Sequence, residues 1–287
     1  MSEILHIILH ALGDSVAILP FLFLTYLAME LLEHKAGERV ERAIARTGKA
    51  GPAIGGALGL IPQCGFSAMA SGLFAGHLIT PGTLLAVFLA TSDEMLPIFL
   101  GAGVAPLRIL AVLGIKLCVA LPTGFLVDFL LRKRVRRLKL VELCEEERCH
   151  CEHGLLRSAL YHTAKVFLFV LAVNLLIGAA FELLGEERIG EVLVGLPWLS
   201  TLLSALVGLI PNCAASVLIA TLWTKGVISG GAMLAGLLTG AGAGLLVLFR
   251  TNRHLRENLQ LLAVLLGTGL LVGFLFDLTG LSLLLGL

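Results

Sequence analysis

The chain alternates long apolar stretches with short polar connections along its whole length. The apolar stretches fall near 12–33, 51–78, 82–101, 105–131, 159–184, 196–223, 227–249 and 259–287. Several of them hold twenty or more residues, which is the length that an α-helix needs to cross the hydrocarbon core of a bilayer. The pattern therefore predicts an all-α polytopic membrane protein.

One motif occurs twice, 149 residues apart. The sequence GLIPQCGFS at 59–67 returns as GLIPNCAAS at 208–216. A proline and polar side chains are costly in the middle of an apolar helix. Membrane transporters use such breaks, at corresponding places in two halves, to build a site near the middle of the membrane. The repeat predicts a first transmembrane repeat at 1–131, a linker at 132–157 and a second transmembrane repeat at 158–287.

The basic residues predict how the chain threads the membrane. They gather in the connections at 34–50, 132–139 and 250–256, and the positive-inside rule places such loops in the cytoplasm. Three apolar stretches lie between the first two of these loops, so three simple crossings would put the loops on opposite sides. The conflict disappears if the stretches with the motif, 51–78 and 196–223, are re-entrant or broken-helix hairpins.

Each half then has three transmembrane helices and one hairpin of two segments, which gives five segments per half and ten in total. The odd number of crossings in a half makes the two repeats inverted, and the opposed hairpin tips meet near the middle of the membrane. The alternative is eight plain crossings with parallel repeats, which would leave the basic loop at 34–50 outside.

Composition supports a membrane protein. Apolar residues make up 57% of the chain and charged residues 14%, whereas a soluble domain has about 45–50% and about 25%. The net charge of +1 gives no reason to expect a nucleic acid as partner. We expect a multi-pass protein of the cell inner (plasma) membrane, with the linker in the cytoplasm and the lipid bilayer as its surroundings.

The two motif copies and a nearby polar stretch supply the candidate site. Proline frees backbone carbonyls, amides and hydroxyls donate and accept, and sulfur suits thiophilic metals. The candidate substrate-binding residues are Gln63, Cys64, Ser67, Asn212, Cys213, Ser216, Thr91 and Ser92, and the candidate metal ligands are Cys64, Cys213, Asp93, Glu94 and Met95. The alternative interpretation is that Cys serves as a small membrane residue and Ser as a hydrogen-bonding contact between helices.

Two adjacent acids interrupt the stretch at 82–101. Asp93 and Glu94 could bind a cation or carry a coupled proton, and alternatively could cap a half-helix. The corresponding stretch in the second half, 240–244, holds only glycine and alanine, so the two halves are not equivalent. Lys116 is the clearest basic residue inside an apolar stretch, and Asp128 is expected to reach an interface from a segment end.

The linker packs cysteine and histidine closely together. A tract of this composition indicates metal binding, although its spacing is not that of a zinc finger. It could capture or sense metal in the cytoplasm, or it could be a solvated connection. Its candidate ligands are Cys144, Cys149, His150, Cys151 and His153.

The chain resembles the putative ten-transmembrane heavy-metal exporter family, also labelled putative manganese transporter or arsenic efflux protein. The resemblance rests on Leu19–Tyr26 with Glu30, on 61–67, on 91–94 and on 210–213. It implies metal export by a protein of ten segments, which agrees with the count above when each hairpin counts as two.

The sequence therefore predicts a secondary transporter that exports a divalent or heavy-metal cation, manganese- or zinc-like, through a site between the two Pro-amide-Cys breaks. The transported metal is the expected partner, no cofactor is required, and a homodimer is considered by analogy with hairpin transporters. The alternatives are an arsenite, anion or organic-acid carrier and, in another class, a membrane metal sensor or scaffold. No phosphate-binding loop and no His-Glu-x-x-His motif occurs, so we do not expect an enzyme.

Overall fold

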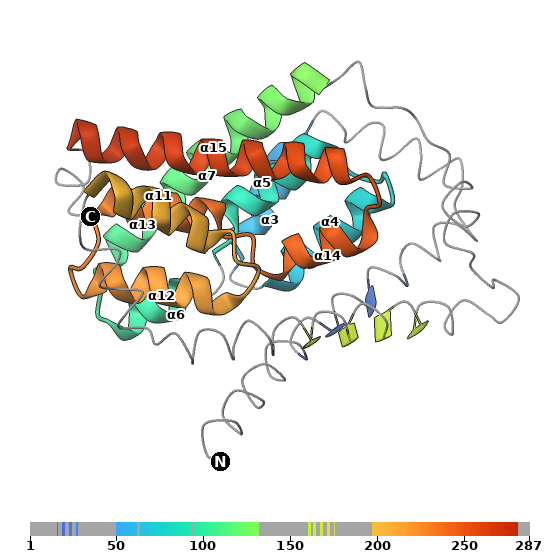
Figure 1. Cartoon of the computed structure of the whole chain (residues 1–287), viewed down its shortest axis with the longest axis horizontal. Helices are drawn as coiled ribbons and strands as arrows, with labels where there is room; N and C mark the ends of the chain where they lie inside the picture. Colours follow the sequence, from blue (N-terminus) through green and yellow to red (C-terminus); the bar gives the residue numbers. More distant parts are fainter. Residues whose placement is uncertain are drawn as a thin grey trace, which may run out of the picture.

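The structure, a computed structural model, describes residues 50–61, 64–92, 95–131 and 197–280, with scattered positions at 16–27 and 160–175. Its elements in these ranges are helices. The first half contains α3 (Gly51–Gly59), α4 (Cys64–Ala75), α5 (Pro81–Ala90), α6 (Met95–Gly101) and α7 (Pro106–Leu131). The second half contains α11 (Pro197–Gly208), α12 (Cys213–Thr224), α13 (Gly230–Thr239), α14 (Ala243–Thr251) and α15 (Leu255–Thr279), as Figure 1 shows.

The internal repeat extends from the sequence to the elements. Adding 149 to the bounds of α4 gives those of α12, and the same shift carries α5 onto α13. Each motif copy falls between two helices, α3 and α4 in one half and α11 and α12 in the other. The motif therefore interrupts a helix in both halves, as its proline predicts.

The start of α5 is held by a carboxylate from α7. The backbone N–H of Thr83 donates to the side chain of Thr80, which caps the helix (3.1 Å). Asp128 accepts from the Thr80 hydroxyl (2.7 Å) and from the backbone N–H of Gly82 (2.8 Å). We expected Asp128 only to reach an interface, and the structure adds that its half-buried carboxylate binds the orphan donors of a helix N-terminus.

The second half repeats this capping arrangement. The carboxylate of Asp277 in α15 accepts from the Ser229 hydroxyl (3.0 Å) and from the backbone N–H of Gly231 (3.1 Å) at the start of α13. A third bond comes from the hydroxyl of Thr201 in α11 (2.9 Å). The same contact on two equivalent helices shows that the halves share one way of packing.

The chain between α3 and α5 reverses direction. A Cβ added to Gly51 would lie 2.3 Å from Thr83 Oγ1, and one added to Gly59 would lie 2.6 Å from the carbonyl oxygen of Val87. The two helices therefore run parallel, start beside start and end beside end. Because α5 begins where α3 began, α4 carries the chain back, and the motif stands at the turning point.

The helices α5 and α6 follow one another along the length of α7. Near the start of α5, Gly82 packs on Gly124 of α7, whereas the end of α5 meets Lys116. The ten residues of α5 extend about 15 Å, and the 26 residues of α7 extend about 39 Å. The break at 91–94 therefore lies near the middle of α7, and α6 continues beyond it.

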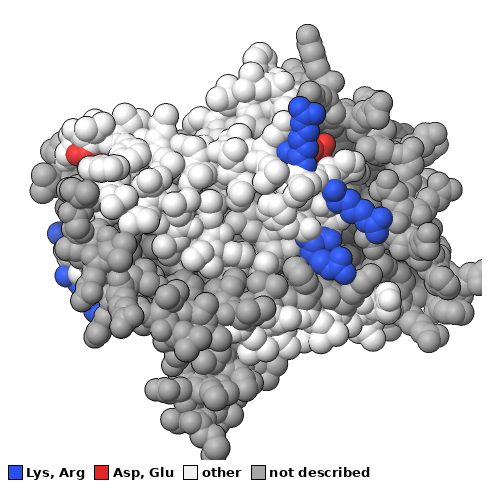
Figure 2. Space-filling model, in the orientation of Figure 1, with Lys and Arg blue, Asp and Glu red and all other residues white. Residues whose placement is uncertain are grey.

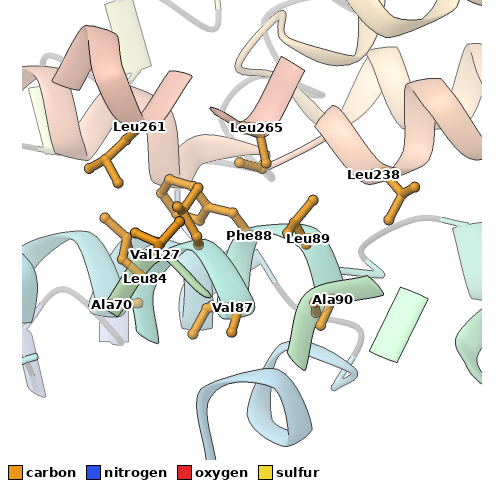
Figure 3. Close-up of a cluster of buried hydrophobic side chains, with 14 of the residues drawn as sticks. Ala70, Leu84, Val87, Phe88, Leu89, Ala90, Val127, Leu238, Leu261 and Leu265 are labelled. Carbon is orange, nitrogen blue, oxygen red and sulfur yellow. The ribbon is translucent and has the colours of Figure 1, made fainter. Parts of the chain in front are cut away.

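In each half, the helix that follows the motif packs against the other half. The helix α4 lies along α14, and α12 lies along α6. An apolar cluster joins both halves where Leu84 and Phe88 of α5 meet Leu261 and Leu265 of α15 (Figure 3). In Figure 1, α7 and α15 run in opposite directions across the bundle.

The outer surface of the described helices suits a bilayer. Within the part of the chain that the structure describes, three helices are long and apolar enough to cross a membrane: Pro106–Leu131, Gly230–Thr251 counted across its break, and Leu255–Thr279. Large apolar side chains point outward from α7 and α15, among them Leu107, Phe129, Leu271 and Leu278. On the face in Figure 2, the charged side chains gather toward the two ends of the long axis, with a broad uncharged area between them.

Candidate functional site

Four interruptions of the helices define the candidate site. They are the chain segments 60–63, 91–94, 209–212 and 240–242, and each follows a helix of half the membrane-spanning length or little more. In the first half, Gly59 at the end of α3 packs against Val87 and Ala90 at the end of α5. The first motif copy therefore lies beside the break at 91–94.

The second half brings its own two breaks together in the same way. A Cβ added to Gly208, the last residue of α11, would lie 2.2 Å from the carbonyl oxygen of Gly236 in α13. The hydroxyl of Thr239, the last residue of α13, donates to the carbonyl oxygen of Ala205 in α11 (2.9 Å). The second motif copy therefore lies beside the break at 240–242.

A third contact joins the breaks of the two halves. The hydroxyl of Ser71 in α4 lies within donating distance of the carbonyl oxygens of Gly244 (2.7 Å) and Ser67 (2.9 Å). A Cβ added to Gly244 would lie 2.8 Å from Ser67 Cβ. The chain just after the break at 240–242 thus lies against the first turns of α4, directly after the first motif copy.

Lys116 stands where the broken helices of the two halves meet. Its side chain is fully buried, and its ammonium donates to the carbonyl oxygens of Thr91 and of Leu237, the latter at 2.9 Å. Thr91 caps the C-terminus of α5, and Leu237 belongs to the last turn of α13. Both carbonyls are among those that a helix leaves without an intrahelical partner at its C-terminal end.

The position of Lys116 along α7 gives the depth of this meeting point. Lys116 is the eleventh of the 26 residues of α7, which places it about 4 Å from the middle of a helix about 39 Å long. The two half-length helices α5 and α13 therefore end near the centre of the bundle, and contacts tie the other two breaks to them.

The ends of α5 and α13 attract positive charge. Each helix C-terminus carries about half a negative elementary charge, and these two ends present their carbonyl oxygens to the Lys116 ammonium. The corresponding position in the second half is Leu265, which is fully buried among apolar side chains.

Two predicted substrate-binding residues, Thr91 and Ser92, lie buried at this centre. The Thr91 hydroxyl donates to the carbonyl oxygen of Val87 (2.7 Å), and the Ser92 hydroxyl donates to that of Ala90 (2.9 Å). A hydroxyl has one proton to donate and two lone pairs. Since both protons are used within α5, these hydroxyls can only accept from, or coordinate, a ligand.

The other described candidates have different surroundings. Ser67 is buried against Gly244, Asn212 is buried immediately before α12, and Ser216 is half-buried in α12. Met95 is fully buried in a second apolar cluster together with Phe99. The structure thus brings Ser67, Thr91 and Ser92 to the contacts between breaks, and it surrounds Met95 with hydrocarbon side chains.

Several predicted ligands lie outside the described residues. These are Gln63, Asp93 and Glu94, the side chains of Cys64 and Cys213, and Cys144, Cys149, His150, Cys151 and His153 of the linker. The backbone of the two motif cysteines is described, and it places them as the first residues of α4 and α12. Among the described residues, no group of three or more His, Cys, Asp or Glu could hold a metal ion.

The sequence did not reveal the part that Lys116 plays. It marked Lys116 only as a basic residue inside an apolar stretch. A charged residue in such a stretch indicates a functional position, and this signal could have led to the site. Its acceptors stand 25 and 121 residues away along the chain. Only the packing of α7 between two broken helices makes them neighbours.

Comparisons with known proteins give a family match. The model of a family described as "Putative, 10TM heavy-metal exporter" matches residues 3–187, which is more than half of the chain. No curated protein and no solved structure matches the chain.

Proposed function

The chain belongs to the family of putative ten-transmembrane heavy-metal exporters, and we propose that it is a secondary transporter that exports a divalent metal cation, with Mn²⁺ and Zn²⁺ as the first candidates. The observation that carries this proposal is the convergence of four helix breaks near mid-depth of an apolar helical bundle. Broken backbone at such depth is tolerable only where protein buries it or where it lines a path for a polar substrate.

The proposed topology is two inverted repeats, each with three crossings and one hairpin. Its support is the contact between helices of the two halves. The helix α4 runs from the centre back to the side of the bundle where α3 began. The helix α14 runs from the centre to the side opposite the start of α13. These two helices can lie along one another only if the halves enter from opposite sides, and α12 with α6 repeats the relation. The positive-inside rule then places the linker in the cytoplasm of the inner membrane.

The chemistry of the centre supports a cation as the substrate. Two helix C-termini point at it, and the hydroxyls of Thr91 and Ser92 have only lone pairs to offer. Cys64 and Cys213, the first residues of α4 and α12, would offer soft sulfur to thiophilic metals. Asp93 and Glu94 would add oxygen ligands and a group that exchanges protons, which would couple export to the proton gradient.

One observation favours arsenite as a second candidate. The ammonium of Lys116 places a positive charge at the meeting point of the breaks, and that charge opposes a cation. Arsenite is neutral at pH 7 and would not be repelled. Trivalent arsenic would bind the thiolates of Cys64 and Cys213, so the motif cysteines serve both candidates.

Transport by the purified full chain tests the proposal. Proteoliposomes loaded with Mn²⁺, Zn²⁺, Cd²⁺, Cu⁺ or arsenite are compared for release by the wild type and by Cys64→Ala, Cys213→Ala and Asp93→Asn. The matched control is Cys118→Ala, because Cys118 is a free, exposed cysteine on α7. We expect each site variant to lower release of the carried species at least about tenfold and the control to leave it unchanged. Full release from all three site variants would refute the site.

A further inference from the structure

Lys116 is a buried cation that the proposed transport site does not yet use. Its side chain has no exposed surface, and it stands near the middle of a helix long enough to cross the membrane. An ionised side chain at that depth is costly unless protein groups replace its water. Here carbonyl oxygens at the ends of α5 and α13 do so.

We propose that Lys116 is a tethered substitute for the transported cation: in the empty carrier its ammonium occupies the position between the ends of α5 and α13, and the metal ion displaces it on binding. This inference rests on the proposed function, because it assigns a competitor to the same site. It makes Lys116 a residue that sets which form of the carrier can change its orientation.

The contacts of the ammonium have the form of a cation site. The acceptors are backbone carbonyls at helix C-termini, which are the groups that discontinuous helices offer to transported cations. They come from both halves of the chain, since Thr91 ends α5 and Leu237 belongs to α13. A metal ion between these ends would meet the ammonium on the same oxygens, and the two positive charges would exclude each other.

Lysine suits a removable occupant. Its charge is compact and stands on a flexible stem of four carbons, so the head can swing away while α7 stays in place. Only the first half carries an ammonium group here, because the equivalent position in the second half is Leu265. One ammonium therefore donates to both helix ends when no metal is bound.

The consequence concerns the return of the empty carrier. Without the ammonium, an empty centre would leave the buried carbonyl oxygens of Thr91 and Leu237 without this donor, and an unsatisfied buried acceptor is costly. The tethered ammonium removes that cost, so the carrier can return without a metal ion and can catalyse net export. Without the ammonium, the carrier returns only with metal bound, and it exchanges one metal ion for another.

Two fluxes distinguish these behaviours. Vesicles loaded with ⁵⁴Mn²⁺ are placed in metal-free buffer to measure net release, or in buffer with unlabelled Mn²⁺ to measure exchange. For Lys116→Met we expect net release to fall at least about tenfold while exchange stays near the wild-type rate. Cys118→Ser, an exposed position on the same helix, is the control that keeps both fluxes.

Lys116→Gln separates charge from hydrogen bonding and covers a Lys116→Met protein that fails to fold. Its amide can still donate to both carbonyls, but it carries no charge. We expect it to behave as Lys116→Met does, and to bind Mn²⁺ about tenfold more tightly than the wild type in detergent, because the competitor is gone. Wild-type fluxes in Lys116→Gln, or weaker Mn²⁺ binding, would overturn the inference.

The outcomes also separate the two proposals. If the wild type moves none of the metals tested, the proposed function fails and this inference with it. If the wild type moves Mn²⁺ but the folded Lys116 variants lose release and exchange in equal proportion, only the inference fails. Lys116 would then be a structural tie between the halves.

Discussion

Replacing Gly244 with alanine should disturb the contact between the two halves at the candidate site. A Cβ at this position would lie 2.8 Å from Ser67 Cβ, 2.8 Å from Phe88 Cε1 and 2.9 Å from the backbone carbonyl carbon of Ser67. All three distances are shorter than a carbon–carbon contact allows. Because one neighbour is backbone, α4 and α14 must separate to admit the methyl group.

The size of the effect follows from three contributions. Overpacking of a close helix contact costs about 1–3 kcal/mol. Separation of the helices also weakens the bond from the Ser71 hydroxyl to the Gly244 carbonyl, 2.7 Å long, which is worth about 0.5–1.5 kcal/mol. Alanine regains at most about 1 kcal/mol because it favours a helix more than glycine does. We expect the free energy of unfolding to fall by about 1–3 kcal/mol.

Gly267→Ala is the matched control. Gly267 lies in the middle of α15, and nothing stands within 4 Å of the Cβ position. This variant keeps only the gain in helix propensity, so its stability should equal or exceed that of the wild type. The assay is equilibrium unfolding in mixed detergent micelles, followed by circular dichroism. If Gly244→Ala proves as stable as Gly267→Ala, the close packing of α4 on α14 is wrong.

Two further outcomes test the caps and the membrane-facing surface. Asp277→Ala and Asp128→Ala each remove a carboxylate that caps a broken helix, so each should lower the free energy of unfolding by about 1–3 kcal/mol. The control Glu257→Gln, in the first turn of α15, should change this free energy little. Equal stability of all three variants would count against the capping role. Cys118 is exposed near the middle of α7, so in a variant whose other cysteines are serine a membrane-impermeant maleimide should label it only after denaturation in detergent, and rapid labelling in intact membranes would contradict the proposed depth.

Much of the fold is predictable from local features of the sequence. The prolines at 62 and 211 predict interrupted helices, and α3 ends and α4 begins around the first of them, as α11 and α12 do around the second. The basic loops predict a segment that turns back, which stays a prediction for the membrane; within the helices, α3 and α5 run parallel with α4 between them in the chain. The break at 91–94 was predicted as a polar interruption, and it separates α5 from α6.

The candidate site was only partly predictable. Thr91, Ser92 and Ser67 were chosen because they accompany the breaks, and they are buried where the breaks meet. The roles of Lys116 and Asp128 depend on partners that local sequence does not identify. Asp128 looks like any acid near a segment end until α7 packs on α5 and brings its carboxylate to Gly82.

The sequence by itself determined that this protein is helical, lies in a membrane and consists of two similar halves, because apolar length, proline position and repetition are properties of single segments. Tertiary structure alone decided that α5 and α13 end at one ammonium and that α4 lies along α14. The physical reason is that a hydrogen bond between distant residues requires a particular register and crossing of two helices. Hydropathy determines which face of a helix is buried. The close approach of backbones at glycine and the capping of helix ends determine which neighbouring helix that face packs against, and in which register.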